Sequence, residues 1–140
     1  MSSQPQYLLD TNVLSETRKK QANERVVSFL SNVEPSSLYI SVLTLGELRK
    51  GIAIKAKSDP DAARKLSSWV DGLEYSFADR ILSIDTKIAS LWGQLCAERS
   101  RPVIDTLLAA TAISHKLVLV TRNTNDVAGI KVSIVNPWKQ

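Results

Sequence analysis

The sequence predicts an α/β fold built around a mostly parallel sheet. Short unbroken apolar runs, typical of strands buried on both faces, alternate along the chain with longer segments of helical periodicity. Several of these runs are followed directly by a residue that can cap a helix. Such alternation produces βαβ units with helices on both faces of the sheet. A chain of 140 residues with 44% hydrophobic residues suits one domain with its own core.

In the first half of the chain, polar residues that can cap helices follow two apolar runs. Asp10, Thr11 and Asn12 follow the first run, and Ser41 follows the second. The expected elements are a strand over 7–9, a helix over 13–17, a short helix over 26–30, a strand over 38–40 and a long helix over about 42–57.

The second half starts with Asp59-Pro60-Asp61, which indicates a helix start because proline is tolerated in the first turn. Leu66, Trp69, Val70 and Leu73 then recur on one helical face, so Trp69, like Trp92 further on, is expected in the core or in a subunit contact. The remaining expected elements are a strand over 81–84, a helix over 86–99 capped by Asp85, a helix over 105–114, and strands over 117–121 and 132–135.

The chain has one cysteine and one histidine, which excludes several kinds of site. A disulfide framework, a cysteine-based zinc site and a two-histidine metal site are impossible. Cys96 lies mid-helix and is expected to be a buried, inert thiol. A Ser-His-Asp or Cys-His arrangement would depend on His115, which ends an apolar helix. No apolar run approaches the roughly 20 residues that span a bilayer, and residues 1–6 do not resemble a signal peptide, so we expect a soluble, cytoplasmic protein.

Four carboxylates stand where a predicted strand or helix begins or ends. In open parallel sheets, ligands bind beyond the carboxyl ends of the strands, which is where Asp10 and Asp126 are expected. If all four side chains meet there, they form a concentrated negative pocket. The four are Asp10, Glu47, Asp105 and Asp126.

Each acid also has an ordinary structural explanation. Asp10 and Asp105 can cap the helices that follow them, and Asp126 lies in an Asn-Thr-Asn-Asp run typical of an Asx-turn. Against this, Asp105 heads an apolar stripe and is expected to point inward. Glu47 has apolar neighbours, which is unusual for a solvated glutamate, and Gly46 beside it suggests that another backbone passes close by.

Carboxylates held close together raise one another's pKa or bind a cation. Because histidine and cysteine are nearly absent, the expected cation is a hard one that prefers oxygen, Mg²⁺ or Mn²⁺. One or two such ions lower the pKa of a bound water and stabilise charge on a phosphate during in-line displacement. Neutral residues that can orient bound waters or the carboxylates are Thr11, Asn12, Thr121 and Asn123.

The net charge of +4 favours an anionic partner, although an unspecialised basic surface explains the net charge equally well. Basic residues gather near the expected pocket at 18–20, at 49–57 and at 99–101. A negative pocket with a positive rim suits a phosphate-bearing substrate that binds through both metal and basic side chains. An acidic peptide would also suit the rim.

The chain resembles the PIN-domain ribonucleases of the VapC type, which are toxins of bacterial type II toxin–antitoxin pairs. The resemblance covers nearly the whole length, and we expect one PIN domain over 1–140. It rests on five blocks in order: Tyr7–Asn12, Ser41–Gly51, Asp105–Ala112, Leu119–Asn123 followed by Asp126, and Asn136-Pro137-Trp138.

This resemblance implies a three-layer α/β/α fold and Mg²⁺- or Mn²⁺-dependent endonucleolytic cleavage of RNA. It implies that the four acids hold the metal, with Thr121 and Asn123 in support. It also implies a homodimer and a cognate antitoxin whose C-terminal segment wraps the toxin, often with an arginine in the acidic pocket. Operator DNA would be bound only through the other end of that antitoxin.

Two other functions would use the same residues. A non-catalytic module would receive a partner's arginine in the acidic pocket, but the complete set of four acids favours catalysis. A nuclease acting on DNA would use the same chemistry, but the chain is short and lacks an added domain to grip DNA. The sequence therefore favours a metal-dependent endoribonuclease.

Overall fold

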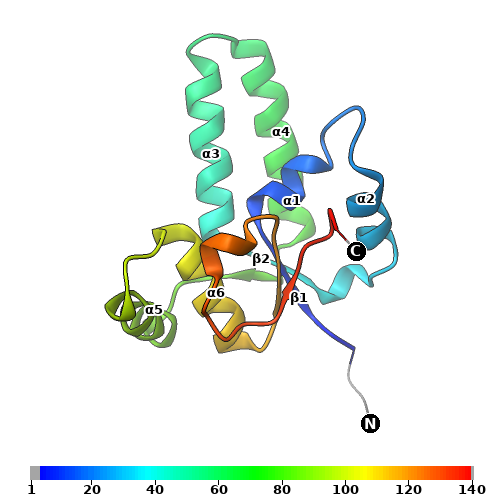
Figure 1. The fold of residues 1–140 in the computed structure, drawn as a ribbon. Helices are drawn as coiled ribbons and strands as arrows, with labels where there is room; N and C mark the ends of the chain where they lie inside the picture. Colours follow the sequence, from blue (N-terminus) through cyan, green and yellow to red (C-terminus); the bar gives the residue numbers. More distant parts are fainter. Residues whose placement is uncertain (1–3, 140) are drawn as a thin grey trace.

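A sheet of five parallel strands forms the centre of the computed structural model, which describes residues 4–139 (Figure 1). The strands are β1 (Tyr7–Leu9), β2 (Leu38–Ser41), β3 (Ile81–Leu82), β4 (Val118–Val120) and β5 (Ile134–Val135). They lie in the order β3-β2-β1-β4-β5, and every pair is parallel. In the central strand, Leu8 is level with Tyr39 of β2 and Leu119 of β4. The predicted parallel sheet is confirmed.

Helices connect these strands along the described part of the chain. The α-helices are α1 (Thr11–Glu16), α2 (Glu24–Ser31), α3 (Val42–Ala56), α4 (Pro60–Ser76), α5 (Thr86–Glu98) and α6 (Val103–His115). Two 3₁₀ helices, which the sequence did not predict, are η1 (Pro35–Ser37) and η2 (Thr124–Val127). All six predicted helices are present, with ends that differ by a few residues from those expected.

Capping side chains set where several helices begin. The Ser41 hydroxyl accepts a hydrogen bond from the Leu43 N–H at 3.0 Å, and Asp85 accepts one from Ile88 at 2.9 Å, as predicted. The predicted start of α6 was wrong. The Pro102 carbonyl already accepts the first helical hydrogen bond from the Thr106 N–H, so Asp105 is the third residue of the helix rather than its cap.

Apolar side chains on the two faces of the sheet build two core clusters. Leu8 packs with residues of α5 and α6, and Leu9, the next residue, packs with residues of α1, α2 and α4 on the other face. Successive strand residues point to opposite faces, so β1, β2, β3 and β4 each contribute to both clusters. Trp92 packs against the first cluster and Trp69 against the second. Helices cover both faces, which confirms the three-layer α/β/α fold.

The sheet order changes direction at its centre. From β1 the chain moves outward through β2 to β3, then returns to place β4 on the other side of β1 and β5 beyond it. Connections leaving β1 and β4 therefore diverge, which opens a crevice at their carboxyl ends. Asp10 directly follows β1, and Thr121 directly follows β4.

Helices α3 and α4 run side by side as a hairpin that projects from the rest of the molecule (Figure 1). The Arg49 guanidinium joins them by donating hydrogen bonds to Asp71 at 2.7 Å, Glu74 at 3.1 Å and Ser67 at 3.2 Å.

The expected backbone beside Gly46 is absent, because a Cβ built there meets no described atom within 4 Å. Gly46 instead lies exposed on α3.

None of the helices described within residues 4–139 combines the length and the apolar character needed to cross a membrane.

Glycines in open helical positions predict a gain in stability. Gly72 lies exposed inside α4, and a Cβ there meets nothing within 4 Å, so Gly72→Ala should raise the free energy of unfolding by about 0.5–1 kcal/mol. Gly129 has the same open surroundings but a φ of +83°, so Gly129→Ala should lower stability. Urea denaturation of both variants checks this, and a Gly72→Ala protein no more stable than wild type would contradict it.

Candidate functional site

Asp10 is held rigidly at the carboxyl end of the central strand. Only 4% of the residue is exposed. One carboxylate oxygen, Oδ1, accepts a hydrogen bond from the Thr11 N–H at 2.6 Å, and Oδ2 accepts one from the Thr121 hydroxyl at 2.7 Å. The Asp10 N–H itself donates to the Val120 carbonyl at 3.0 Å. Contacts from the start of α1 and from the residue after β4 therefore fix this carboxylate, which also caps α1.

Burial raises the pKa of Asp10, while the hydrogen bonds from Thr121 and Thr11 lower it, and the charges of Glu47 and Asp126 raise it further. The net direction is upward, because desolvation disfavours the ionised form. The charges of two other predicted acids, Glu47 and Asp126, therefore affect the pKa of Asp10.

Asp105 has a pKa well above its ordinary value. Burial, followed by the charges of Asp10 and Asp126, a hydrogen bond with Asp126 and the charge of Glu47, raises the pKa of Asp105 to about 6. Its half-buried side chain projects from the first turn of α6. Asp105 therefore interacts with each of the other three predicted acids, which come from elements distant in the sequence.

Glu47 reaches the site from the exposed side of α3, so the expectation that it avoids solvent was wrong. The neighbouring Leu48 is buried and Leu45 is partly buried, whereas Glu47 lies on the solvent-facing side of the helix. Its Oε1 accepts a hydrogen bond from the Thr11 hydroxyl at 2.5 Å. Thr11 thus links Glu47 to Asp10, because its N–H binds Asp10 and its hydroxyl binds Glu47.

Asp126 enters the site from η2 and is half-buried. Its N–H donates to the Asn123 carbonyl at 3.1 Å, which closes the turn after β4. The predicted Asx-turn is replaced by this 3₁₀ turn, in which no side chain caps the first N–H groups. The turn brings Asp126 close to Asp105.

Of the four neutral residues predicted to support the acids, the two threonines bind them through side chains and the two asparagines do not. Thr11 and Thr121 bind the acids directly through their hydroxyls. Asn123 acts through its backbone, since its N–H donates to the Thr121 hydroxyl at 3.0 Å. In the described part of the chain, no hydrogen bond is formed by the side chains of Asn12 or Asn123.

No lysine, arginine or histidine among residues 4–139 forms an ion pair with any of the four acids. Instead, the described ion pairs involve other carboxylates: Glu16, Asp61, Asp71, Asp79, Glu74 and Glu98. The acidic cluster therefore lacks internal compensation, although the protein as a whole carries net positive charge. A cluster of this kind favours binding of a cation from outside the chain.

The donor set suits a hard divalent ion, because every candidate ligand atom is a carboxylate or hydroxyl oxygen. Within the described residues, however, no three histidine, cysteine or acidic side chains are already arranged closely enough to enclose an ion. The acids interact through their charges without closing around one point, as expected for repelling groups.

Three arginines of the expected basic clusters are used by the fold, whereas Lys50, Lys55 and Lys57 stay exposed. Arg49 binds α4, and the side chain of Arg101 is only 4% exposed and donates to the Leu95 and Ala128 carbonyls. Arg99 also donates to Ala128, at 3.2 Å. The positive rim is therefore weaker than predicted at 99–101 and at Arg49, because these arginines satisfy backbone or carboxylate oxygens within the molecule.

Sequence reasoning overlooked Glu16, which is only 5% exposed. It pairs with Lys19 at 2.9 Å and accepts a hydrogen bond from the Asn23 N–H at 2.9 Å. The Lys19 hydrogen bond, then that of Asn23, lowers the pKa of Glu16, and the charges of Lys19 and Arg122 contribute. The Glu16–Lys19 spacing of one helical turn was the available signal.

Cys96, expected to be buried, is partly exposed.

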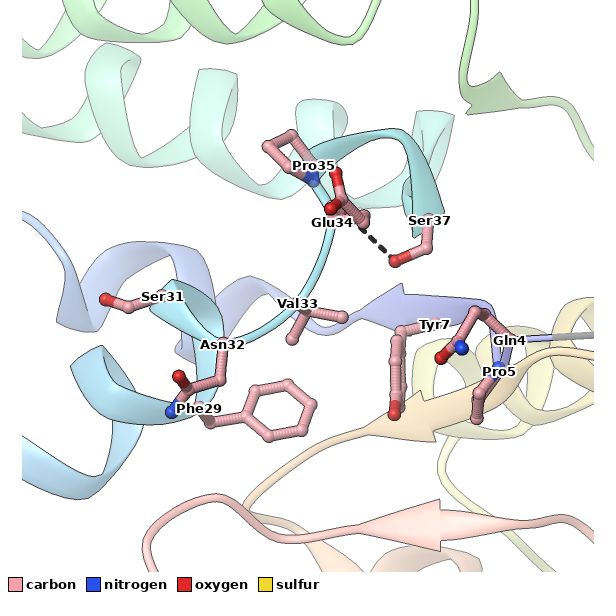
Figure 2. Close-up of a pocket in the computed structure, with 10 residues that line it drawn as sticks. All are labelled: Gln4, Pro5, Tyr7, Phe29, Ser31, Asn32, Val33, Glu34, Pro35 and Ser37. Carbon is pink, nitrogen blue, oxygen red and sulfur yellow. Dashed lines mark hydrogen bonds between the residues drawn. The ribbon is translucent and has the colours of Figure 1, made fainter.

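The described residues line several open spaces, two of which lie beside β1 and along α3. A cavity of about 800 Å³ lies where β1 and β2 begin, at the opposite edge of the sheet from Asp10, with the rings of Tyr7 and Phe29 packed edge to face (Figure 2). A groove of about 500 Å³ runs along α3 and includes Glu47, Gly46 and Ile104 in its lining. Only the second space adjoins the acidic cluster.

Comparisons with known proteins agree with the geometry. The family model of the PIN domain matches residues 7–129. Toxin FitB of Neisseria gonorrhoeae is 35% identical over 140 residues, and the match covers 94% of this chain and 97% of that protein. VapC ribonuclease Y4jK of Sinorhizobium fredii is 30% identical, with the same coverage of 94% and 97%. A solved structure of FitAB bound to the IR36 DNA fragment has a TM-score of 0.85 and 31% identity, covering 96% of each chain.

The match to the family model extends from β1 through η2, so it includes all four acids. Both relatives match over nearly the full length of each protein. The chain belongs to the PIN-domain family.

Proposed function

We propose that this protein is a metal-dependent endoribonuclease that acts as the toxin of a VapC-type toxin–antitoxin pair. The observation that carries this proposal is the group of four mutually repelling, unpaired carboxylates at the crevice between β1 and β4. The match to a VapC ribonuclease and to a toxin supports RNA as the substrate and toxicity as the outcome. Such a toxin works in the cytoplasm, where RNA is present.

Asp10, Glu47, Asp105 and Asp126 would hold Mg²⁺ or Mn²⁺. When bound, the ion would activate water and stabilise negative charge on the phosphate. Thr121 and Thr11 keep both oxygens of Asp10 in fixed directions, so little reorganisation is needed there. Asp105, with its pKa raised to about 6, keeps a proton in the metal-free protein at mildly acidic pH, and ion binding must displace that proton.

A toxin made inside its own host requires a neutralising partner, and we propose a cognate antitoxin. The groove along α3 offers apolar lining from Val42 and Ile54 beside the exposed carboxylate of Glu47. An apolar partner segment with one cationic side chain would match both features. Operator DNA would be contacted through that partner, in an assembly built on a toxin homodimer. The likeness to FitAB, whose solved structure contains a DNA fragment, supports the contact with DNA.

Loss of either central aspartate should abolish cleavage. Asp10→Asn and Asp105→Asn each remove one negative charge from the proposed metal site, and we expect the rate of RNA cleavage to fall by at least about 100-fold. Cutting of end-labelled RNA in Mg²⁺ measures this, and Asp61→Asn on the surface of α4 is the matched control. Undiminished cutting by both variants, or by wild type in excess chelator, would contradict the proposal. Faster cutting of a DNA strand of the same sequence would indicate a DNA nuclease.

The Thr121 hydroxyl should contribute to metal affinity without being a ligand. Thr121→Val leaves Oδ2 of Asp10 unsatisfied, so we expect Mn²⁺ affinity to fall by about 10- to 100-fold. Isothermal titration measures the affinity. Thr111→Val, which removes a hydroxyl bound only to the Leu107 carbonyl, is the control. Equal Mn²⁺ affinity in wild type and Thr121→Val would refute this role.

Stability without metal should depend on pH through Asp105. Its pKa is about 6 in the folded protein and 3.8 ordinarily, so the folded state binds the proton more tightly. Rising pH then deprotonates the unfolded chain first and favours unfolding. In chelator, the Tm of wild type relative to that of Asp105→Asn should fall as the pH rises from about 4 to about 7, and Mg²⁺ should reverse the fall. Parallel Tm curves for the two proteins would count against this interpretation.

A further inference from the structure

Arg122 is the one residue between two positions that are locked to the acidic cluster. On one side, the Thr121 hydroxyl donates to Asp10, and on the other, the Asn123 N–H donates to Thr121. The Thr121 N–H also binds the Val135 carbonyl of β5 at 3.0 Å. The backbone of Arg122 is therefore rigidly placed at the rim of the crevice.

The Arg122 side chain is held in one orientation by stacking on Trp138. Its guanidinium carbon lies 5.0 Å from the centre of the Trp138 ring. Trp138 is in turn held by its own N–H, which donates to Asn136 at 3.0 Å, and by its carbonyl, which accepts from Arg25 at 3.3 Å. Stacking on an aromatic face orients a guanidinium while leaving its N–H donors available.

Those donors have no carboxylate partner. Within residues 4–139, Arg122 forms no ion pair and no side-chain hydrogen bond, and it is exposed. Its charge helps to lower the pKa of Glu16, after the stronger effects of Lys19 and Asn23, but Glu16 itself is bound to those two residues. Arg122 thus differs from Arg49 and Arg101, which the fold uses internally.

We propose that Arg122, held on Trp138, binds the phosphate next to the one that is cut. This proposal rests on the proposed ribonuclease function. An acidic crevice repels the sugar–phosphate backbone, so a strand that enters it needs a cation at the rim. The planar guanidinium presents paired N–H donors that match two phosphate oxygens. Arg122 is then a positioning residue that strengthens RNA binding without taking part in bond cleavage.

The first step of the test finds an RNA site. Wild-type protein is incubated with total bacterial RNA in Mg²⁺, and the new RNA ends are sequenced. A labelled RNA containing that site then serves as the probe. If the wild type cuts no RNA, both the proposed function and this inference fail. Cutting by the wild type leaves the inference to be decided separately, by RNA affinity.

Affinity is measured in Asp10→Asn protein, which binds without cutting. Adding Arg122→Gln should raise the Kd about tenfold and reduce the slope of log Kd against log salt by about 0.7, the value for one phosphate of a single strand. Adding Lys65→Gln, which removes an equal charge on the exposed surface of α4, should change neither. Adding Trp138→Leu should weaken binding but keep the salt slope, because the charge remains.

A methylphosphonate at single linkages of the RNA locates the contact, because it removes the charge of one phosphate at a time. At the linkage beside the cut site, the difference in Kd between the proteins with and without Arg122→Gln should disappear. In the nuclease with Asp10 intact, Arg122→Gln should raise KM and leave kcat nearly unchanged. Equal Kd and salt slope with and without Arg122→Gln, or a difference that persists at every linkage, would overturn the inference. So would an effect confined to binding of a protein partner.

Discussion

The constraint on which the rest of the site depends is a carboxylate buried at the end of the central strand. Asp10 has almost no contact with solvent, and burying a charge is costly unless hydrogen bonds compensate. Its two oxygens find that compensation in the Thr11 N–H and the Thr121 hydroxyl. Because Thr121 belongs to the turn after β4, the same contacts that satisfy Asp10 also join the two strands at which the sheet order reverses.

Repulsion among the acids gives the crevice its chemical character. Three carboxylates from α3, α6 and η2 add their charges to that of Asp10, and no described basic side chain neutralises them. A fold that leaves such a cluster unpaired sacrifices stability at neutral pH, as the raised pKa of Asp105 indicates. A divalent ion bound by these carboxylates, as proposed, would offset this loss of stability.

Features that depend on local pattern were predictable from the sequence. Apolar runs indicated the parallel strands, and the sheet order places Asp10 and Asp126 near enough for their charges to interact. The predicted burial of Glu47 was wrong, because neighbours along the chain do not reveal which way one helical position faces. The contribution of the arginines to the basic rim was overestimated for a related reason. Arg49 and Arg101 bind partners that only the folded chain brings near.

Long-range contacts explain the remaining gaps. The stacking of Arg122 on Trp138, and the bond from Arg25 to the Trp138 carbonyl across 113 residues, have no signature in the sequence. The start of α6 at Val103 was missed because proline at a cap position gives no hydrogen-bonding signal. Packing of distant segments, rather than local propensity, decides each of these details.

The central claim is that the four carboxylates together hold a divalent ion. Anomalous diffraction from crystals grown with Mn²⁺ tests it most directly. The account predicts one or two Mn²⁺ peaks between β1 and α6, with oxygens of Asp10 and Asp105 at about 2.0–2.6 Å. A well-occupied Mn²⁺ at another surface, with the crevice between Asp10 and Asp105 left empty, would contradict it.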